Sequence, residues 1–298
     1  MANLNNVGIK EYNRVHFEWF LVDWCNYKCS YCSSATIMVD KFSKETSPAK
    51  YKLVLQRLSA LDEEFEMDLF GGEPTLHPQF LDIIEEMSAM DNCKLIEIKS
   101  NLSKPLHFFE TVFKSNKVKL SASYHAEYYD QKFLDKCVAL KDYNFYVHIN
   151  LSDKPEHWPQ ILDMIKYFDE QQVKYDLNQL WSTPGNDIVY TPEFYDTFQP
   201  LIGNISDKQT YRFGFDDGTE RQIPIFLAFK EKLTTFTGLT CKALLYEILS
   251  DGTIVNACTR KTAPLNLKKS TLCVNVTCPR PSCHADFMLN FYKEQCPK

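Results

Sequence analysis

The chain contains 298 residues, of which 44% are hydrophobic, so it is long enough to bury one large core and a smaller second one. Its formal net charge is −6, from 33 Lys and Arg against 39 Asp and Glu, which argues against the broad positive field that drives binding to nucleic acid. The longest strongly apolar stretch, Ile223–Phe229, is far shorter than the roughly 18 residues of a spanning helix, so we expect no membrane contact.

Short apolar and β-branched runs predict six strands in the first 180 residues, because each run is too short for a buried helix. The predicted strands lie at Phe17–Trp24, Phe65–Phe70, Lys94–Lys99, Lys117–Ala122, Asn144–Asn150 and Val173–Leu180. Amphipathic segments between them predict helices. In the segment Tyr51–Leu61, Val54 and Leu58 share a face, and Ser47-Pro48 supplies a cap and a first-turn proline. Similar patterns follow at Phe80–Met87, Leu106–Lys114, Asp130–Lys141 and Trp158–Gln171.

After the first unit, the predicted strands recur roughly every 25 to 30 residues, which predicts an α/β fold with a parallel sheet covered by helices. Six such units suggest a partial (β/α)6 TIM-type barrel, with functional residues at the carboxyl ends of the strands. Past about Ser182 the alternation is lost, and the later part holds six of the eleven cysteines. We therefore expect a barrel domain over residues 1–200 and a small cysteine-rich domain over residues 201–298.

The cysteines are better explained by metal or cluster ligation than by disulfides. The first thirty residues lack the basic start and apolar core of a secretory signal, so we expect a cytoplasmic protein. Thiols stay reduced in that compartment, and the count of eleven is odd.

Three of the cysteines stand in one loop, directly after the first predicted strand. Cys25, Cys29 and Cys32 have the spacing Cys-x3-Cys-x2-Cys. Three thiolates can wrap one loop around three corners of a cubane iron–sulfur cluster and leave the fourth iron open. The alternative is a zinc knuckle, although zinc usually takes four closed ligands in paired Cys-x2-Cys units.

A second motif follows the second predicted strand, as Gly71-Gly72-Glu73-Pro74. Glycine lets the backbone approach a ligand, and Glu73 can accept hydrogen bonds from an ammonium group, although the motif alone is an ordinary strand-to-helix turn. The cysteine loop, with Tyr31 before its last cysteine, and this turn one β-α unit later resemble two motifs of the radical S-adenosylmethionine superfamily.

The resemblance implies that Cys25, Cys29 and Cys32 hold a 4Fe-4S cluster whose open iron binds S-adenosylmethionine. A reductant such as flavodoxin or ferredoxin would supply an electron, and cleavage would yield a 5′-deoxyadenosyl radical that takes a hydrogen atom from the substrate. Gly71, Gly72, Glu73 and Pro74 would then contact the S-adenosylmethionine amino group.

The resemblance also implies that Asn101 and Ser123, at the ends of the third and fourth strands, contact the nucleoside. The alternative for both is a satisfied strand-end or cap residue. His125 is our candidate catalytic residue, as an acid, a base or a substrate contact, with helix capping as the alternative. Asn150, Gln179 and Trp181 are substrate-pocket candidates by position alone.

Six cysteines fall in the last 58 residues, and Asp251-Gly252 predicts a hairpin turn between the first two. Their layout resembles the auxiliary-cluster extensions called SPASM and twitch domains, although a full SPASM domain carries seven cysteines and two clusters. We expect one further 4Fe-4S cluster. Its ligands would be Cys241, Cys258, Cys278 and Cys283, with His284 or Cys296 as replacements and a zinc site as the alternative. Cys93 and Cys137 are expected to be buried apolar residues.

The sequence leaves three functions open. The first is oxidoreduction of a small molecule or sugar, in which the auxiliary cluster accepts an electron. The second is modification of a peptide or protein. The third is a non-enzymatic iron–sulfur or zinc protein, which leaves the order of the two motifs unexplained.

Overall fold

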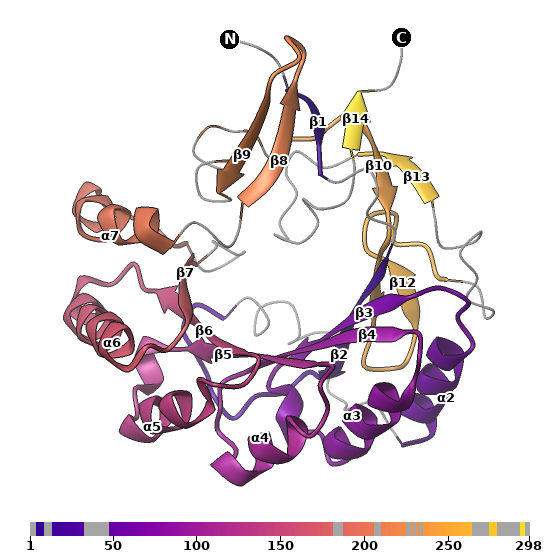
Figure 1. Cartoon of the computed structure of the whole chain (residues 1–298), viewed down its shortest axis with the longest axis horizontal. Coiled ribbons are helices and arrows are strands. Elements are labelled where there is room, and N and C mark those ends of the chain that lie inside the picture. Colours follow the sequence, from indigo (N-terminus) through magenta and orange to yellow (C-terminus); the bar gives the residue numbers. More distant parts are fainter. Residues whose placement is uncertain are drawn as a thin grey trace.

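The structure is a computed structural model that describes residues 4–8, 14–32, 48–180, 187–205, 210–224, 228, 231, 233, 235–263, 274–278 and 293–295. It has an α/β fold with two sheets (Figure 1). The larger sheet has the strand order β12-β11-β2-β3-β4-β5-β6-β7. Its strands are β2 (Val15–Val22), β3 (Phe65–Gly71), β4 (Cys93–Ser100), β5 (Val118–Tyr124), β6 (Phe145–Leu151), β7 (Tyr175–Gln179), β11 (Leu245–Ile248) and β12 (Ile254–Asn256).

Parallel pairing runs from β11 through β7, and β12 joins β11 in the antiparallel direction. This confirms the predicted parallel sheet, and all six predicted strands form within a few residues of their expected bounds. Closure into a six-unit partial barrel stays a prediction.

Helices cover the outer side of the curved sheet (Figure 1). They are α2 (Pro48–Ser59), α3 (Phe80–Ala89), α4 (Leu106–Val112), α5 (Gln131–Leu140) and α6 (Trp158–Gln171), followed by α7 (Pro192–Ile205). Short 3-10 helices begin just after three of the strand ends, as η1 (Pro74–Leu76), η2 (Ala126–Tyr128) and η3 (Pro155–His157). Asp130 caps α5 by accepting a hydrogen bond from the Lys132 N–H.

The smaller sheet has the order β13-β10-β14-β1-β8-β9, and its neighbouring strands are antiparallel. Its strands are β1 (Leu4–Val7), β8 (Thr210–Phe215), β9 (Glu220–Pro224), β10 (Leu239–Ala243), β13 (Val274–Thr277) and β14 (Lys293–Gln295). The chain thus crosses between the sheets, since β1 joins the later strands while β11 and β12 extend the larger sheet. The expected division at residue 200 falls inside α7.

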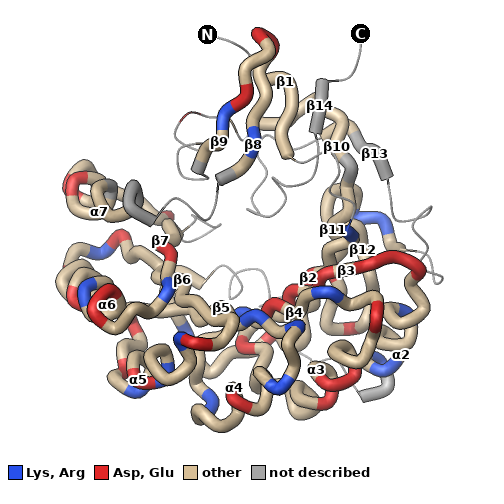
Figure 2. Tube along the Cα trace, viewed as in Figure 1, with Lys and Arg blue, Asp and Glu red and all other residues tan. Residues whose placement is uncertain are grey.

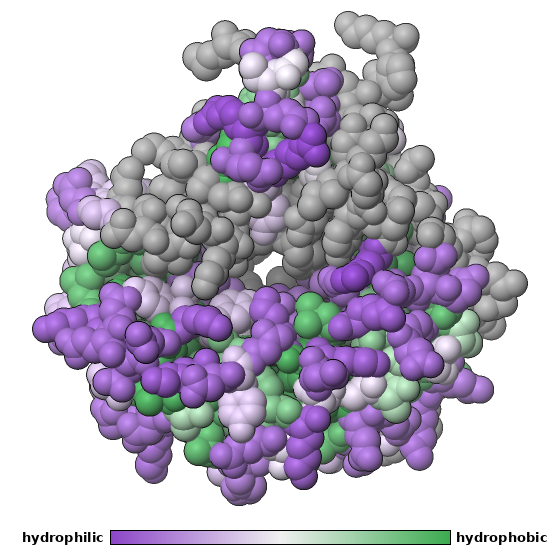
Figure 3. Space-filling view, viewed as in Figure 1, coloured by the Kyte–Doolittle hydropathy of each residue, from purple (hydrophilic) through white to green (hydrophobic). Residues whose placement is uncertain are grey.

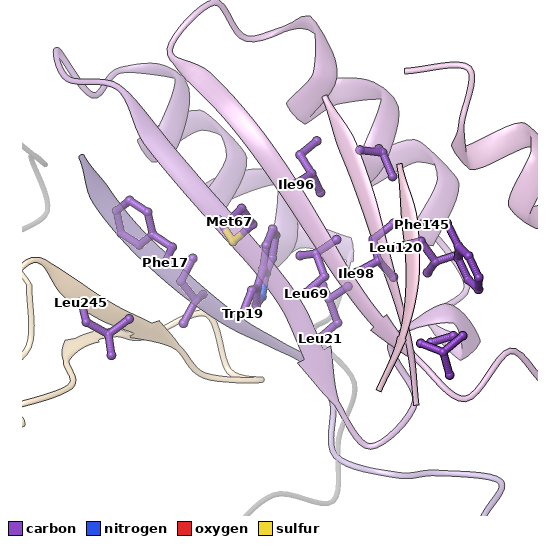
Figure 4. Close-up of a cluster of buried hydrophobic side chains, with 14 of the residues drawn as sticks. Phe17, Trp19, Leu21, Met67, Leu69, Ile96, Ile98, Leu120, Phe145 and Leu245 are labelled. Atoms are coloured by element: carbon purple, nitrogen blue, oxygen red, sulfur yellow. The ribbon is translucent and has the colours of Figure 1, made fainter. Parts of the chain in front are cut away.

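The core lies between the larger sheet and its helices. Phe17, Trp19 and Leu21 of β2 alternate along the strand and point to the helix side, together with side chains of the neighbouring strands (Figure 4). Cys93 and Cys137 are fully buried in this core, as the sequence predicts. The outer surface over the helices is mainly hydrophilic, with apolar side chains showing between them (Figure 3). Among the described residues, no helix is long and apolar enough to cross a membrane.

Candidate active site

The cysteine loop leaves β2 at the carboxyl edge of the sheet. Cys29 is buried, while Cys25 and Cys32 are partly exposed. Within the loop, the Cys32 N–H donates to the Cys29 carbonyl at 3.1 Å and the Tyr27 N–H lies 3.3 Å from the Cys25 sulfur. These contacts are few, so neighbouring loops must fix much of the conformation.

The Gly71-Gly72 turn packs directly on the start of the cysteine loop. A Cβ on Gly71, where φ is +135°, would lie 2.1 Å from the Val22 carbonyl oxygen, and one on Gly72 would lie 2.0 Å from that of Trp24. The Gly72 N–H donates to Val22 at 2.9 Å and the Glu73 N–H to Trp24 at 3.0 Å. Glycine is therefore required here because two backbones meet, a reason that the sequence motif did not reveal.

Glu73 joins the ends of β3 and β4. Its buried carboxylate accepts hydrogen bonds from the Thr75 N–H and hydroxyl, from the Ser100 hydroxyl at 2.8 Å and from the Asn101 N–H at 2.7 Å. Burial raises the pKa of Glu73, and these donors oppose the rise. Pro74 is buried as the first residue of η1. Glu73 therefore fixes the end of β4 relative to the glycine turn through these hydrogen bonds.

Asn101 reaches from the end of β4 into the cysteine loop. Its side-chain amide lies 3.7 Å from the Cys25 sulfur and donates to the Asn26 side-chain oxygen at 3.0 Å. Its own side-chain oxygen accepts from the Ser103 N–H at 3.0 Å. The structure thus brings Asn101, the glycine turn and the cysteine loop together, and the role of Asn101 at the nucleoside stays a prediction.

His125, predicted as a catalytic residue, stands against the cysteine loop. Its Nδ1 lies 3.4 Å from the Cys29 sulfur and 2.9 Å from the Tyr31 hydroxyl. Its side chain does not cap the 3-10 helix that follows. Burial lowers the pKa of His125 to about 4, so the imidazole is neutral at pH 7. This position makes it a neighbour of a proposed cluster ligand.

The donor set fits a cubane cluster. Burial raises the pKa values of Cys25 and Cys29, that of Cys29 to about 12, and the charges of the neighbouring cysteines add to both shifts. Because the raised pKa values disfavour the thiolate forms, a bound metal centre is needed to stabilise three thiolates in this loop. Within the described ranges, no three His, Cys, Asp or Glu side chains are close enough to share one metal ion.

The sheet face turned away from the helices is strongly polar. Cross-strand register places Glu247, Glu18, Asp68, Glu97 and Lys119 side by side in one row across β11, β2, β3, β4 and β5. Charged positions along the central strands appear in Figure 2. Like charges directly opposite each other destabilise a sheet, so this row needs compensation.

Partners compensate most of the row. Asp68 lies 2.9 Å from the Lys99 ammonium and 3.3 Å from His16, and Glu97 lies 3.0 Å from the Lys119 ammonium. Glu247 pairs with an arginine, Arg260.

The network continues around the sheet from Glu97. The Tyr146 hydroxyl donates to Glu97 at 2.7 Å and lies 3.0 Å from His148, which in turn contacts Asp176. Ser123 stands beside His148 in register, on the same face. Among the described residues, no hydrogen bond joins its side chain to the cysteine loop.

Glu18 differs from its neighbours in the row. It forms no ion pair or side-chain hydrogen bond among the described residues. Burial, together with the charges of Asp68 and Glu247, raises its pKa to about 7 against the opposing effects of Lys99 and His16. The sequence reading missed these residues, although the signal was present: charged side chains alternate with apolar ones inside the predicted strands.

The other position-based candidates divide between the two sheet faces. The Asn150 side chain donates to the Tyr124 carbonyl at 3.0 Å and accepts from Asn178 at the same distance. Gln179 pairs in register with the buried Leu151, which places it on the helix side. Trp181 lies outside the described residues.

The C-terminal cysteines are described in part. Cys241 is buried in β10, next to β13, and Cys258 and Cys278 pack against the same apolar core. The predicted turn at Asp251-Gly252 is present, with the Gly252 N–H donating to Leu249 at 2.8 Å. Cys283, His284 and Cys296 lie outside the described residues.

The fold and the loop arrangement match known proteins. The Radical SAM superfamily pattern matches residues 19–174, just over half of the chain, so this chain belongs to the radical SAM superfamily. Members of this superfamily use a 4Fe-4S cluster to cleave S-adenosylmethionine reductively.

Curated relatives match over a short stretch. The GTP 3′,8-cyclase of Mannheimia succiniciproducens is 32% identical over 83 residues, and that of Haemophilus influenzae is 28% identical over 87 residues. Each match covers 27% of this chain and 24% of the cyclase. The chain thus spans about a quarter of the length of these relatives.

Solved structures share the fold more widely. Streptococcus suis SuiB bound to S-adenosylmethionine aligns with a TM-score of 0.57 and 14% identity, over 84% of this chain and 62% of SuiB. The enzyme anSMEcpe with bound S-adenosylmethionine aligns with a TM-score of 0.57 and 14% identity, over 84% of this chain and 78% of that one. At this identity, the likeness establishes the fold.

Proposed function

We propose that this chain binds its 4Fe-4S cluster through Cys25, Cys29 and Cys32 and uses S-adenosylmethionine to oxidise a polar substrate. The observation that supports the proposal most is the contact between the two motifs. The glycine turn holds the cysteine loop by backbone hydrogen bonds, and Asn101 reaches the Cys25 sulfur from the next strand end.

When bound and reduced by an external one-electron donor, the cluster and S-adenosylmethionine would supply a 5′-deoxyadenosyl radical that can remove a hydrogen atom from the substrate. The protein supplies position and shielding. Backbone atoms of Gly71, Gly72 and Glu73 and the buried Pro74 would line the S-adenosylmethionine amino group, with Tyr31 alongside. Asn101 and Ser123 would contact its nucleoside, and His125 would orient Cys29.

The test is anaerobic reconstitution with iron and sulfide, followed by S-adenosylmethionine and a strong reductant, with 5′-deoxyadenosine as the measured product. Cys29→Ala should abolish the product. Cys93→Ala is the matched control, because Cys93 is also a buried cysteine but lies in the core. Unchanged product in Cys29→Ala would contradict the ligand assignment.

For the substrate we propose a polar small molecule or sugar, because the sheet face away from the helices carries a row of charged side chains. A peptide substrate is the second candidate. It is favoured by fold neighbours solved with peptides, SuiB with its precursor peptide SuiA and anSMEcpe with the Cp18Cys peptide. Screening both classes for substrate-dependent loss of S-adenosylmethionine separates the two candidates.

For the C-terminal region we propose one auxiliary 4Fe-4S cluster on Cys241, Cys258, Cys278 and Cys283. The reconstituted chain should then contain about eight irons and little zinc, and a variant lacking Cys25, Cys29 and Cys32 should keep about four. Stoichiometric zinc without iron in that variant would make the region a structural zinc unit instead.

A further inference from the structure

We propose that the segment His125–Tyr128, together with Lys154, is a clamp that holds the cysteine loop in the geometry that the cluster needs. This inference rests on the ligand set proposed above. The segment follows β5 and includes η2, so it comes from a strand end three positions away from β2 in the sheet. It contacts the loop on both sides of Cys29.

The first contact fixes the residues between Cys25 and Cys29. The Tyr128 hydroxyl accepts a hydrogen bond from the Lys28 N–H at 2.6 Å. The Tyr128 ring also stacks on the Tyr27 ring, with centroids 4.1 Å apart and planes only 4° from parallel. A stacked pair with a hydrogen bond at its edge restricts both the position and the rotation of this part of the loop.

The second contact fixes the residues between Cys29 and Cys32. The Glu127 carboxylate accepts hydrogen bonds from both the N–H and the hydroxyl of Ser30, the first at 2.8 Å. Lys154, which follows β6, donates to Glu127 at 3.2 Å and to the Ser30 hydroxyl at 3.0 Å. The three side chains form a closed triangle, so Lys154 orients the carboxylate that holds the loop.

The third contact reaches the middle cysteine itself. His125 lies between the Cys29 sulfur and the Tyr31 hydroxyl, and its ring is within 6.0 Å of the Tyr31 ring. Each stretch of the loop from Tyr27 to Tyr31 therefore has a partner in the clamp. The loop has few internal hydrogen bonds, so the clamp supplies much of the order that three ligands on one loop require.

Glu127 and Lys154 are positioning residues, because the contacts that they make with the described part of the loop go through Ser30 and not through a cysteine sulfur. Glu127→Ala removes both Ser30 contacts and the ion pair. Glu127→Gln keeps one acceptor oxygen for Ser30 but loses the ion pair. Lys154→Met leaves the Glu127–Ser30 contacts in place. The three variants should therefore form a graded series.

The experiment measures cluster loss. The wild-type chain, the three variants and the double variant Glu127→Ala/Lys154→Met are reconstituted anaerobically and exposed to a chelator, and the absorption and electron paramagnetic resonance signals are followed. Only the signal that Cys29→Ala removes is counted. Glu86→Ala, on the exposed side of α3, is the matched control, and circular dichroism confirms folding.

We expect Glu127→Ala to lose the cluster about tenfold faster than wild type, the effect of losing hydrogen bonds to a charged acceptor. Glu127→Gln and Lys154→Met should have smaller effects, and the double variant should lose the cluster only slightly faster than Glu127→Ala, because the Lys154–Ser30 hydrogen bond is all that Glu127→Ala leaves of the triangle. The resonance line shape should change in Glu127→Ala. Equal loss rates and line shapes in folded Glu127→Ala and wild type would overturn the clamp alone, whereas an unchanged signal in Cys29→Ala would overturn the ligand set and the clamp together.

Discussion

The two faces of the larger sheet use the same strands for different purposes. Toward the helices, β2 presents Phe17, Trp19 and Leu21, all fully buried. On the opposite face the same strand presents His16, Glu18 and Phe20, and its neighbours add more charges. A parallel sheet covered on both faces would read as continuous apolar runs. The charged face is therefore available for something other than a core.

The difference between the two sheet faces indicates which residues stabilise the fold. On the helix side every large side chain contributes by burial. On the charged face the contributions differ in sign: Asp68 is compensated by two cations, whereas Glu18 is partly buried and has no ion pair among the described residues. We expect substitutions to separate these cases.

The largest effect is expected on the helix side. Trp19→Ala should lower the free energy of unfolding by about 3 to 5 kcal/mol, since it removes a fully buried ring and leaves a cavity. Phe20→Ala, next in sequence but half-buried on the other face against Phe70, should cost clearly less. Chemical denaturation of the cluster-free protein measures both. Equal losses would contradict the difference between the faces.

Asp68→Asn should cost about 2 to 3 kcal/mol, because it removes the nearest counter-charge of both Lys99 and His16. The full cost of a broken buried pair is not expected, since the Lys99 side chain is 34% exposed. Chemical denaturation at pH 7 measures this loss in the free energy of unfolding. A neutral outcome would mean that water already compensates these cations.

His16 should make stability depend on pH. Burial opposes its protonation, but the nearby carboxylates of Asp68 and Glu66, 3.3 and 3.8 Å from its ring nitrogens, outweigh this and raise its pKa to about 9. Its contribution, on the order of 2 kcal/mol, should be complete below pH 6.5 and be lost as the pH rises through 9. The difference between wild type and His16→Gln across this range isolates the effect. A difference that stays constant with pH would show that His16 is neutral in the fold.

Glu18→Gln should have the smallest effect and the opposite sign. Its pKa of about 7 exceeds the ordinary value of 4.5, so the carboxylate destabilises the fold increasingly from pH 4.5 to 7 and fully above pH 7. The variant should be more stable by about 1 kcal/mol at pH 8 and unchanged at pH 4.5. Glu86→Gln is the exposed control. A loss of stability at pH 8 would assign Glu18 a structural partner.

The sequence predicted the regular part of the fold well. Strand positions from β2 to β7 and the bounds of α6 agree closely with the structure, because apolar alternation and helix periodicity are local signals. Joining of β11 to β2 could not be predicted, since residues more than 220 positions apart pair there through backbone hydrogen bonds that leave no sequence pattern.

For the site, the sequence identified the cysteine loop and Gly71-Gly72, but not why they belong together. The glycines lie against the backbone of Val22 and Trp24, a contact that the sequence does not show. Glu127 and Tyr128 of the clamp do not belong to any sequence motif that we recognised. Spacing along the chain reports which residues share a loop. It does not report which loops meet at the edge of a sheet.

The central claim is a cluster with one iron left open by the three-cysteine loop. Its most direct test is the electron paramagnetic resonance spectrum of the reduced, reconstituted chain before and after addition of S-adenosylmethionine. We expect the spectrum to change in wild type, because the ligand occupies the open iron, and the responsive signal to be missing in Cys29→Ala. A spectrum that S-adenosylmethionine leaves unchanged would contradict an open site on Cys25, Cys29 and Cys32.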